Sequence, residues 1–408
     1  MGIRSTEIKP SKLFKLRRRI AVVACAIWQR SIVRLFPKEE GNRILLYAAD
    51  NRATVSHLLT YRKSMGDAID NCKYYITGRF SDTTHQGSLH ELKSLCYDAD
   101  VTPIHIDAAG LRHWDVLVTA SPQNAWWIPA PTLFVGHGDG FKSFDGGVSK
   151  YPYDGSLFAD RIIEQRRSVV EAVERDYPIY RGRLVWSGGK DVEAIANGIA
   201  HKEEIRRRLG IPEDRKVVLC WGSFRADSLF HALGHAFLEQ LERLDKTRYH
   251  VILTIHPHEY HRYDTVTEPL GPTIDSYESK DGFTVRHPGQ DHIPYIAASD
   301  VMICDYSSGL DGALLAGIPV VLLKMYENVW RESDYMYMLE DTLTISPGDD
   351  VSTLLERVFG DENKRLCEVS RRYGKELKND SGGYAAAVRK ATLDLLISGK
   401  SDMRRGNR

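Results

Sequence analysis

Short apolar runs alternate with amphipathic stretches along most of this chain, and this alternation constrains the fold more than any other feature of the sequence. In the first half, four runs predict buried strands: Ile44–Ala49, Lys73–Thr77, Val116–Thr119 and Thr132–Val135. Helical spacing is found between them near Thr54–Met65 and Ser88–Tyr97. Strands that alternate with helices form a parallel sheet covered by helices. The pattern therefore predicts an α/β, doubly wound architecture.

The second half of the chain repeats this plan. Its predicted strands are Val217–Cys220, His250–Thr254, Phe283–Arg286, Val301–Cys304 and Val320–Leu323. Its predicted helices are Ser228–Leu244, Ile293–Ala298, Gly309–Leu315, Val351–Phe359 and Tyr384–Ile397. Between the two halves we expect a long helix over Ser156–Tyr177 and a strand over Arg183–Trp186. Two such units in tandem bind ligands between their sheets, at the carboxyl ends of the strands.

This reading divides the chain into four segments. Residues 1–38 form a basic amphipathic segment, 39–190 and 191–380 form two Rossmann-like domains, and 381–408 form a closing helix with a basic tail. A length of 408 residues is sufficient for two separate cores. No G-x-G-x-x-G follows the first predicted strand, so neither NAD nor FAD is expected.

Composition and cysteine usage are those of a soluble protein from a reducing compartment. Hydrophobic residues make up 42% of the chain and charged residues 27%, and the six cysteines show no C-x-x-C spacing. The formal net charge is zero, yet residues 1–38 hold ten Lys or Arg against one acid, Glu7. The basic character therefore belongs to one segment, and no nucleic-acid partner is expected.

Residues 12–36 combine apolar side chains at helical spacing with basic side chains on the other face. The longest apolar run, Ile20–Trp28, is far shorter than the roughly 20 residues that span a bilayer. We expect an in-plane helix on an anionic cytoplasmic membrane face, with Phe14 and Trp28 as interfacial anchors. A signal peptide and an ordinary amphipathic helix packed on the body are the alternatives, although no small-x-small cleavage site follows the apolar run.

The stretch Val301–Pro319 predicts a buried strand that runs into a helix through Asp305-Tyr306-Ser307-Ser308. Backbone N–H groups at a helix N-terminus carry partial positive charge, and two serines add hydroxyl donors, so a phosphate or diphosphate can bind there. Asp311, one turn into the helix, can accept from a ribose or polyol hydroxyl. Alternatively, a serine is an ordinary N-cap and Asp311 a first-turn acid favoured by the helix dipole.

Three further clusters follow predicted strands. Gly136–Ser143 contains three glycines that allow close backbone approach, together with His137 for proton transfer and Lys142 as a point charge for phosphate. The alternative for this cluster is a glycine turn with a solvated histidine. Gly222-Ser223-Phe224-Arg225 offers Arg225 as a phosphoryl clamp, although a surface arginine explains it as well.

The third of these clusters is His256-Pro257-His258, with His261 nearby. A metal site is one interpretation of histidines so close together. Pro257 breaks any helix that would align them, and no carboxylate completes a metal-ligand spacing, so we favour a histidine that donates to phosphate.

The order H-G-x-G-x-K, S-x-R, H-P-H and D-Y-S-S with a downstream Asp resembles the CDP-glycerol glycerophosphotransferase family, the teichoic-acid primases and polymerases. The resemblance runs from about Ala120 to Ile397. Trp186–Asp191 is similar to the Gly-x-Pro-x-x-Asp turn of the family, although Lys190 replaces an expected neutral residue, and Asp380–Gly383 is similar to its Asp-Asp-Gly. The family usually has Thr-Pro where this chain has Asp139-Gly140, and Pro-Thr where it has Gly222-Ser223.

The resemblance implies a GT-B fold, with residues 39–190 as the acceptor domain and residues 191–380 as the nucleotide-donor domain. It also implies His137 as the base near the acceptor hydroxyl. The implied catalytic residues are His137 and His256, and the implied donor-binding or phosphate-binding residues are Lys142, Ser223, Arg225, Ser307, Ser308 and Asp311. No metal and no cofactor besides the nucleotide-activated donor are expected.

These residues together predict a bacterial, peripheral membrane transferase on the cytoplasmic face. It would move a polyol phosphate, with glycerol phosphate from CDP-glycerol favoured, onto a hydroxyl of a lipid-linked or glycan acceptor in cell-envelope or capsule polymer synthesis. A GT-B glycosyltransferase that uses a nucleotide sugar is one alternative, because the same serines and Asp311 would serve it. A catalytically inactive membrane scaffold is the other.

Overall fold

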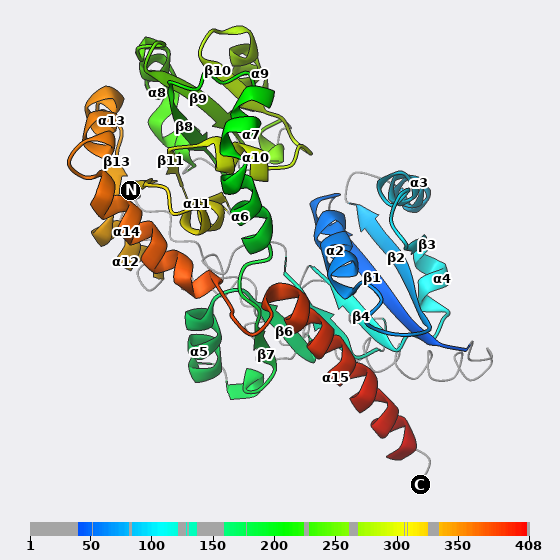
Figure 1. The fold of residues 1–408 in the computed structure, drawn as a ribbon. Coiled ribbons are helices and arrows are strands. Elements are labelled where there is room, and N and C mark those ends of the chain that lie inside the picture. The colour runs from blue at the N-terminus through cyan, green and yellow to red at the C-terminus, as the bar shows by residue number, and fades with distance from the viewer. Residues whose placement is uncertain are drawn as a thin grey trace, which may run out of the picture.

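The computed structural model describes residues 40–50, 52–80, 84–120, 128, 130–136, 159–176, 178–223, 228–260, 268–305, 307, 309–324 and 334–405. These residues form two lobes, each built on a parallel sheet with helices against it (Figure 1). The predicted α/β class is confirmed. The expected membrane helix over residues 12–36 lies outside the described residues, as do His137, Lys142, Arg225 and Ser308.

The sheet of the first lobe has the order β3-β2-β1-β4-β5-β6-β7. Its strands are β1 (Asn42–Asp50), β2 (Cys72–Phe80), β3 (Thr102–Pro103), β4 (Val116–Thr119), β5 (Thr132–Phe134), β6 (Arg161–Glu164) and β7 (Leu184–Trp186). Its helices are α2 (Arg52–Met65), α3 (His85–Leu95), α4 (Ile106–Gly110), α5 (Arg167–Asp176) and the 3₁₀ turn η2 (Pro178–Tyr180). All of the strand pairs are parallel, and β1 pairs β4 with Ile44 opposite Val116.

The sheet of the second lobe has the order β10-β9-β8-β11-β12-β13. Its strands are β8 (Lys216–Trp221), β9 (Tyr249–Thr254), β10 (Phe283–Arg286), β11 (Val301–Cys304), β12 (Val320–Leu323) and β13 (Leu343–Ile345). The helices that follow β7 are α6 (Val192–Ala200), α7 (Lys202–Arg208), α8 (Leu229–Arg243), α9 (Gly271–Asp275), α10 (Ile293–Ala298), α11 (Gly309–Ala316), α12 (Asp334–Asp341), α13 (Val351–Phe359) and α14 (Asn363–Gly374). The 3₁₀ turns are η3 (Pro257–Tyr260), η4 (Ser276–Ser279) and η5 (Lys375–Leu377).

Alternate residues of a central strand contribute to hydrophobic cores on opposite faces of the sheet. In β8, Val218 and Cys220 join a core with α8 and α13, whereas Val217 and Leu219 join a core with α10 and α11. Side chains of successive strand residues point to opposite faces, so a strand covered on both sides is apolar at every position. This is why the strands of this lobe are continuous apolar runs in the sequence.

The last helix, α15 (Gly383–Arg405), returns to the first lobe and packs on α2 (Figure 1). Tyr384, Val388 and Leu395 belong to the hydrophobic core of the first lobe. Tyr61 and Thr392 share a hydrogen bond of 3.0 Å between their hydroxyls. The core of the first lobe is therefore completed by residues more than 300 positions away in the sequence.

Two chain segments join the lobes, and hydrogen bonds link these segments to each other. Gly189 N donates to Leu377 O at 2.7 Å, and Asn379 Nδ2 donates to Trp186 O at 2.8 Å. Gly188 has a φ of 72°, and a Cβ at this position would lie 2.8 Å from Leu377 O. Glycine therefore permits both the backbone conformation and the close approach of the two segments.

The helix expected over Ser156–Tyr177 is wrong in its first half. Within the described part of that range, β6 occupies Arg161–Glu164 and only Arg167–Asp176 is helical. Ile162 and Ile163 are buried in the sheet between β5 and β7. Two adjacent apolar residues are too few to distinguish a short buried strand from a helix in the sequence, and neighbouring strands decide the outcome.

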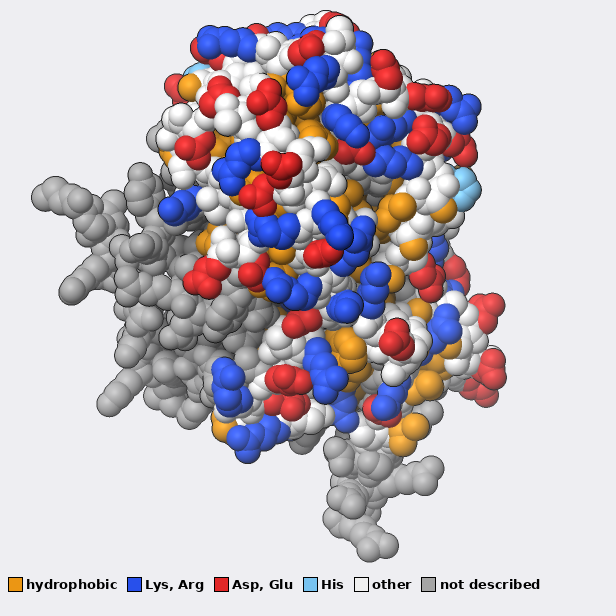
Figure 2. Space-filling model, turned by 60° about the vertical axis from the view of Figure 1, so that its left-hand side comes forward, with side chains coloured by type: hydrophobic (Ala, Val, Ile, Leu, Met, Phe, Trp, Pro, Cys, Tyr) orange, Lys and Arg blue, Asp and Glu red, His pale blue; other side chains and the backbone are white. Residues whose placement is uncertain are grey.

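The exposed face in Figure 2 carries basic and acidic side chains interspersed over its described part, with hydrophobic side chains in small groups. Basic and acidic side chains are therefore mixed over this face. Among the described residues, no helix has both the length and the apolar character needed to cross a membrane.

Candidate functional site

The carboxyl ends of three neighbouring strands bring the candidate residues of the second lobe together. In its sheet order, β8 has β9 on one side and β11 on the other. The chain adds β9 and β10 on one side of β8 and then crosses to add β11, β12 and β13 on the other side. Ligands of such folds bind at this switch point, outside the carboxyl ends of the strands. Ser223 follows β8, His256 follows β9 and Ser307 follows β11. The structure therefore places these three predicted residues along one edge of the sheet.

Asp305, directly after β11, organises this edge. Its side chain is buried, with 1% of the residue exposed. Its Oδ2 accepts from Ser223 N at 2.8 Å and from Leu229 N, at the start of α8, at 2.7 Å. A carboxylate that accepts several backbone N–H bonds fixes the loops that supply them. Asp305 thus holds together the strand ends that carry Ser223 and Ser307.

The start of α11 lies directly against Trp221, the last residue of β8. A Cβ on Gly309 would overlap the indole ring of Trp221, so the helix can begin this close to the sheet only with glycine there. Ser307 N donates to Asp305 O at 2.9 Å, and Leu310 N donates to Ser307 O at 3.1 Å. The Ser307 hydroxyl is buried and has no hydrogen-bond partner among the described residues. It is the kind of donor that a bound anion would satisfy.

His256 is half-buried and precedes the turn η3. Glu259 N donates to His256 O at 2.9 Å, and the buried Glu259 carboxylate lies 2.9 Å from Nε2 of His231 on α8. The turn after β9 is thus anchored to α8. In the described part of the chain, no three His, Cys, Asp or Glu side chains are grouped to hold a metal ion.

Asp311 forms a buried ion pair with Arg166, which follows β6 of the first lobe. Arg166 is 1% exposed and is among the largest fully buried side chains of the described residues. This contact shows that the carboxyl edges of the two sheets face each other. The Asp311 carboxylate therefore already has a cationic partner, and its contact with a nucleotide or ribose stays a prediction.

Two more polar pairs lie at the junction of the lobes. Lys190 Nζ lies 2.9 Å from Nδ1 of His57 on α2, and Asp191 Oδ2 lies 3.3 Å from Nε2 of His292, just before α10. The ring of His292 meets Trp221 edge to face, with centroids 6.2 Å apart. The residues Lys190 and Asp191 belong to the segment that connects β7 to α6, so this segment contacts both lobes.

The environment shifts the pKa values of this segment. Burial lowers the pKa of Lys190 from its ordinary value, while the carboxylates of Asp191 and Asp311 act in the opposite direction. Burial acts to raise the pKa of Asp191, but the hydrogen bond with His292 and the charge of Lys190 outweigh it, and the pKa lies below its ordinary value. The segment thus holds a carboxylate stabilised as an anion beside a partly desolvated ammonium.

On the first lobe, the described chain reaches Gly136, two residues past β5, where φ is 71°. β5 is the neighbour of β6, and the residues after β6 include Arg166, which contacts Asp311 of the second lobe. The end of β5 therefore lies on the edge that faces the second lobe. His137 and Lys142 follow this point in the sequence, outside the described residues.

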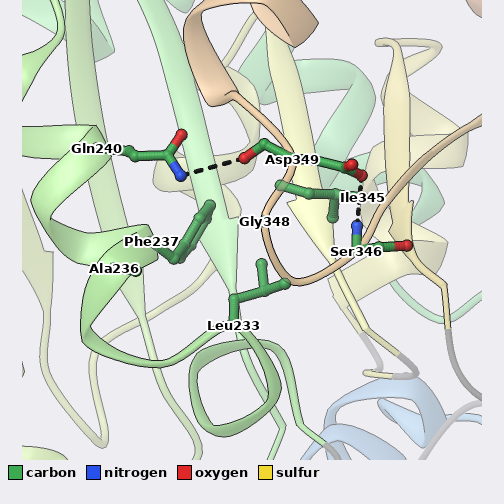
Figure 3. Close-up of a pocket in the computed structure, with 8 residues that line it drawn as sticks. All are labelled: Leu233, Ala236, Phe237, Gln240, Ile345, Ser346, Gly348 and Asp349. Carbon is green, nitrogen blue, oxygen red and sulfur yellow. Dashed lines mark hydrogen bonds between the residues drawn. The ribbon is translucent and has the colours of Figure 1, made fainter.

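Two small surface pockets are lined by other residues than the predicted site residues. A pocket of about 290 Å³ lies beside the crossing segments and is lined by Arg167, Ser168, Glu171, Trp186, Lys375 and Glu376. A crevice of about 20 Å³ lies between α8 and the loop after β13, where Gln240 Nε2 donates to Asp349 O at 3.1 Å (Figure 3). The second is large enough for a single water molecule.

Sequence reasoning missed Arg166, His57, His292 and the role of Asp305. The partners of the first three lie more than 100 positions away in the sequence, and no local pattern identifies such pairs. For Asp305 a local signal exists, because an acid directly after a buried strand and before a helix can accept backbone donors from neighbouring loops. The position was instead interpreted only as part of the anion-binding turn.

Comparison with known proteins extends these observations. Residues 155–310 match the family model for CDP-Glycerol:Poly(glycerophosphate) glycerophosphotransferase. No curated protein matches the sequence. The structure is similar to a variant of the wall teichoic acid polymerase TagF, with a TM-score of 0.57 and 14% identity, over 97% of this chain and 100% of that chain.

Two further solved structures share the fold. A TagF variant soaked with CDPG matches with a TM-score of 0.56 and 14% identity, over 96% of this chain and 99% of that chain. HepE from Anabaena in complex with UDP-glucose matches with a TM-score of 0.51 and 12% identity, over 87% of this chain and 99% of that chain. At such identities the likeness shows the fold, which is GT-B with two Rossmann-like lobes facing a central cleft. Residues 155–310 therefore match the model of the same CDP-glycerol glycerophosphotransferase family that the motifs of this chain resemble.

Proposed function

We propose that the protein transfers a polyol phosphate, with glycerol phosphate from CDP-glycerol as the donor group, onto a hydroxyl of a lipid-linked or glycan acceptor. The family match supports this class of reaction. The observation that carries the proposal is the convergence of Ser223, His256 and Ser307 on one strand edge that faces the first lobe across the Arg166–Asp311 contact.

The donor would bind to the second lobe, with its diphosphate at the start of α11. Backbone N–H groups of that turn and the Ser307 hydroxyl supply hydrogen bonds to phosphate oxygens. His256, and Arg225 and Ser308 from the sequence, would complete the diphosphate site. These groups neutralise the charge that develops during transfer, so the proposed reaction requires no resident metal.

The acceptor would enter from the first lobe. His137 would remove the proton from the acceptor hydroxyl as its oxygen attacks the distal phosphorus of CDP-glycerol. The bond from that phosphorus to the bridging oxygen breaks, and CMP leaves with the electron pair. The product carries one new phosphodiester, and His137 returns its proton to solvent.

We place this reaction at the cytoplasmic face of a bacterial membrane, in the synthesis of a cell-envelope or capsule polymer. The support is the basic amphipathic sequence of residues 12–36, which suits an anionic lipid surface. Flotation of the full chain with liposomes of anionic lipid, against liposomes of neutral lipid alone, tests the placement. Equal recovery with both kinds of liposome would refute it.

A donor screen with product mass tests the reaction itself. CDP-glycerol, CDP-ribitol and UDP-, GDP- and CMP-sugars are each incubated with the enzyme and a polyol-terminated lipid acceptor. The expected result is CMP release from CDP-glycerol and an acceptor heavier by roughly 154 Da, one glycerol-phosphate unit. Turnover with a nucleotide sugar alone would instead support a glycosyltransferase, the second candidate, which the shared fold with HepE in complex with UDP-glucose favours.

A further inference from the structure

The junction of the two lobes contains a Lys–His pair that the proposed transfer does not use. Lys190 Nζ lies 2.9 Å from Nδ1 of His57, and both side chains are half-buried. His57 belongs to α2 of the first lobe, whereas Lys190 belongs to the segment that crosses to the second lobe. Asp311, in the first turn of α11, is near enough to act on the Lys190 charge. The pair therefore lies close to the turn proposed to bind phosphate.

The carboxylates around Lys190 are each bonded to another group. Asp311 pairs with Arg166, and Asp191 lies 3.3 Å from His292. Among the described residues, no carboxylate oxygen is within 4.0 Å of Lys190 Nζ, and the imidazole of His57 is its hydrogen-bond partner. Lys190 is thus a partly buried cation with a neutral acceptor in direct contact.

An ammonium group has three N–H donors, and His57 accepts one of them. Removing a charged group from water is costly unless a partner of opposite charge or further hydrogen bonds offset the loss. An oxyanion beside Lys190 would accept the remaining donors and place a negative charge in direct contact with the ammonium. Because His57 Nδ1 accepts from the ammonium, the imidazole also fixes the position of the Lys190 side chain.

We propose that Lys190 and His57 form an anion subsite at the junction of the lobes and that it binds a phosphate oxyanion of a substrate. The evidence that a subsite exists is the set of contacts and charges of the described residues. The choice of phosphate among oxyanions rests on the proposed function. Because its two residues come from the first lobe and from the crossing segment, a bound phosphate also ties these two parts together.

Phosphate binding to matched variants tests this subsite. Inorganic phosphate and glycerol 3-phosphate are titrated by calorimetry into the wild-type chain, Lys190→Met, Lys190→Arg and the control Lys364→Met. Lys364 is an exposed cation on α14, an element that carries neither residue of the pair. We expect Lys190→Met to weaken both ligands by about tenfold to a hundredfold, because a charge-assisted bond is lost. Lys190→Arg and Lys364→Met should stay within about threefold of wild type.

A second pair of variants tests the imidazole. His57→Asn keeps a side-chain acceptor near Nδ1, whereas His57→Leu removes it. Phosphate should bind His57→Asn nearly as well as wild type and His57→Leu several-fold more weakly. If both variants bind phosphate like wild type, the imidazole has no part in the subsite.

Unfolding without phosphate gives an independent readout. Burying a charge without a partner of opposite charge in direct contact is costly, so its replacement by an apolar side chain of similar length removes that cost. We therefore expect Lys190→Met to melt at the wild-type temperature or above it and to lose the rise in melting temperature that phosphate causes in wild type. Lys190→Gln provides the same comparison should Lys190→Met not fold.

Two results would overturn the subsite: wild type that binds no phosphate, or Lys190→Met that binds it as tightly as wild type. CDP-glycerol binding to the same samples keeps the two proposals apart. Wild type that binds phosphate through Lys190 but not CDP-glycerol would refute the donor and leave the subsite. Wild type that binds CDP-glycerol, with phosphate binding unchanged in Lys190→Met, would refute the subsite and leave the donor.

Discussion

The first six strands of each lobe follow the same order, and β7 is an additional strand of the first lobe, but the edges that face each other differ in their chemistry. The second lobe offers backbone N–H groups and hydroxyls, arranged around the buried Asp305. The described edge of the first lobe and its crossing segment contribute Lys190 and His57, together with Arg166, which is paired with Asp311. Dipoles on one side and charges on the other suit a substrate whose phosphates lie between them. The comparison suggests that one lobe holds the donor and the other sets up the attack.

The largest expected effect comes from removing the base that this division assigns to the first lobe. His137→Ala should lower turnover on the order of 10² to 10⁴, because the acceptor hydroxyl loses its proton acceptor. The affinity for CDP-glycerol should hardly change, since the proposed donor site is on the other lobe. Steady-state kinetics and calorimetry measure the two quantities. Near-normal turnover would remove His137 from the mechanism, and a lost donor affinity would break the division between the lobes.

The contact between the lobes comes next. Arg166→Ala leaves the buried carboxylate of Asp311 without its ion-pair partner and should destabilise the fold by about 3–5 kcal/mol in urea unfolding. The double variant Arg166→Met, Asp311→Leu removes both charges and should recover most of this loss. If the double variant also keeps its affinity for CDP-glycerol, Asp311 does not bind the donor. A single variant as stable as wild type would show that the pair does not hold the lobes together.

Within the second lobe, Asp305→Ala should cost about 3 kcal/mol, because the N–H groups of Ser223 and Leu229 lose their acceptor in a buried place. Asp305→Asn keeps one carboxamide oxygen as an acceptor and should cost less. We also expect Asp305→Ala to weaken CDP-glycerol binding more than phosphate binding at Lys190, since only the first depends on these loops. Equal weakening of both ligands would contradict the separation of the two edges.

The smallest expected effect is on the melting temperature at acidic pH. The pKa of Asp191 is lower in the folded chain than its ordinary value of 3.8. Its carboxylate therefore adds stability that is present above that value and is lost as the pH falls through the lower, folded-state pKa. Asp191→Asn should make the fall in melting temperature shallower in that acid range and change little near neutral pH. An identical acid profile for the variant would show that the link to His292 adds no stability.

Much of the fold follows from the sequence, because strands covered on both faces are apolar throughout. The expected ranges Phe283–Arg286 and Val301–Cys304 are those of β10 and β11. The short strands were harder, since β3 has two residues, one of them Pro103, and neighbouring strands determine it. The helix α14 is polar on one side and was not expected, although its Leu366 and Val369 are buried.

The candidate site divides in the same way. Ser223, His256 and Ser307 could be grouped from sequence, because each follows a strand and parallel strands end at one edge. The partner of Asp311 could not be inferred, since Arg166 lies 145 positions away on the other lobe. Lys190 was noticed as an unusual residue, but its contact with His57 depends on how α2 approaches the crossing segment. Pairings between distant elements are set by the assembled fold and not by any local pattern.

The return of α15 to the first lobe makes the second lobe an insertion in chain order. The chain enters and leaves the second lobe at neighbouring positions, where Gly189 N donates a hydrogen bond to Leu377 O. During synthesis, the ribosome releases β8 to β13 before Val388 and Leu395 exist to complete the first core. Domains generally fold as units, and the amino-terminal one usually matures first. In this protein we expect the reverse order: the first lobe begins at the amino-terminal side, but its hydrophobic core is completed only after the second lobe has been synthesised.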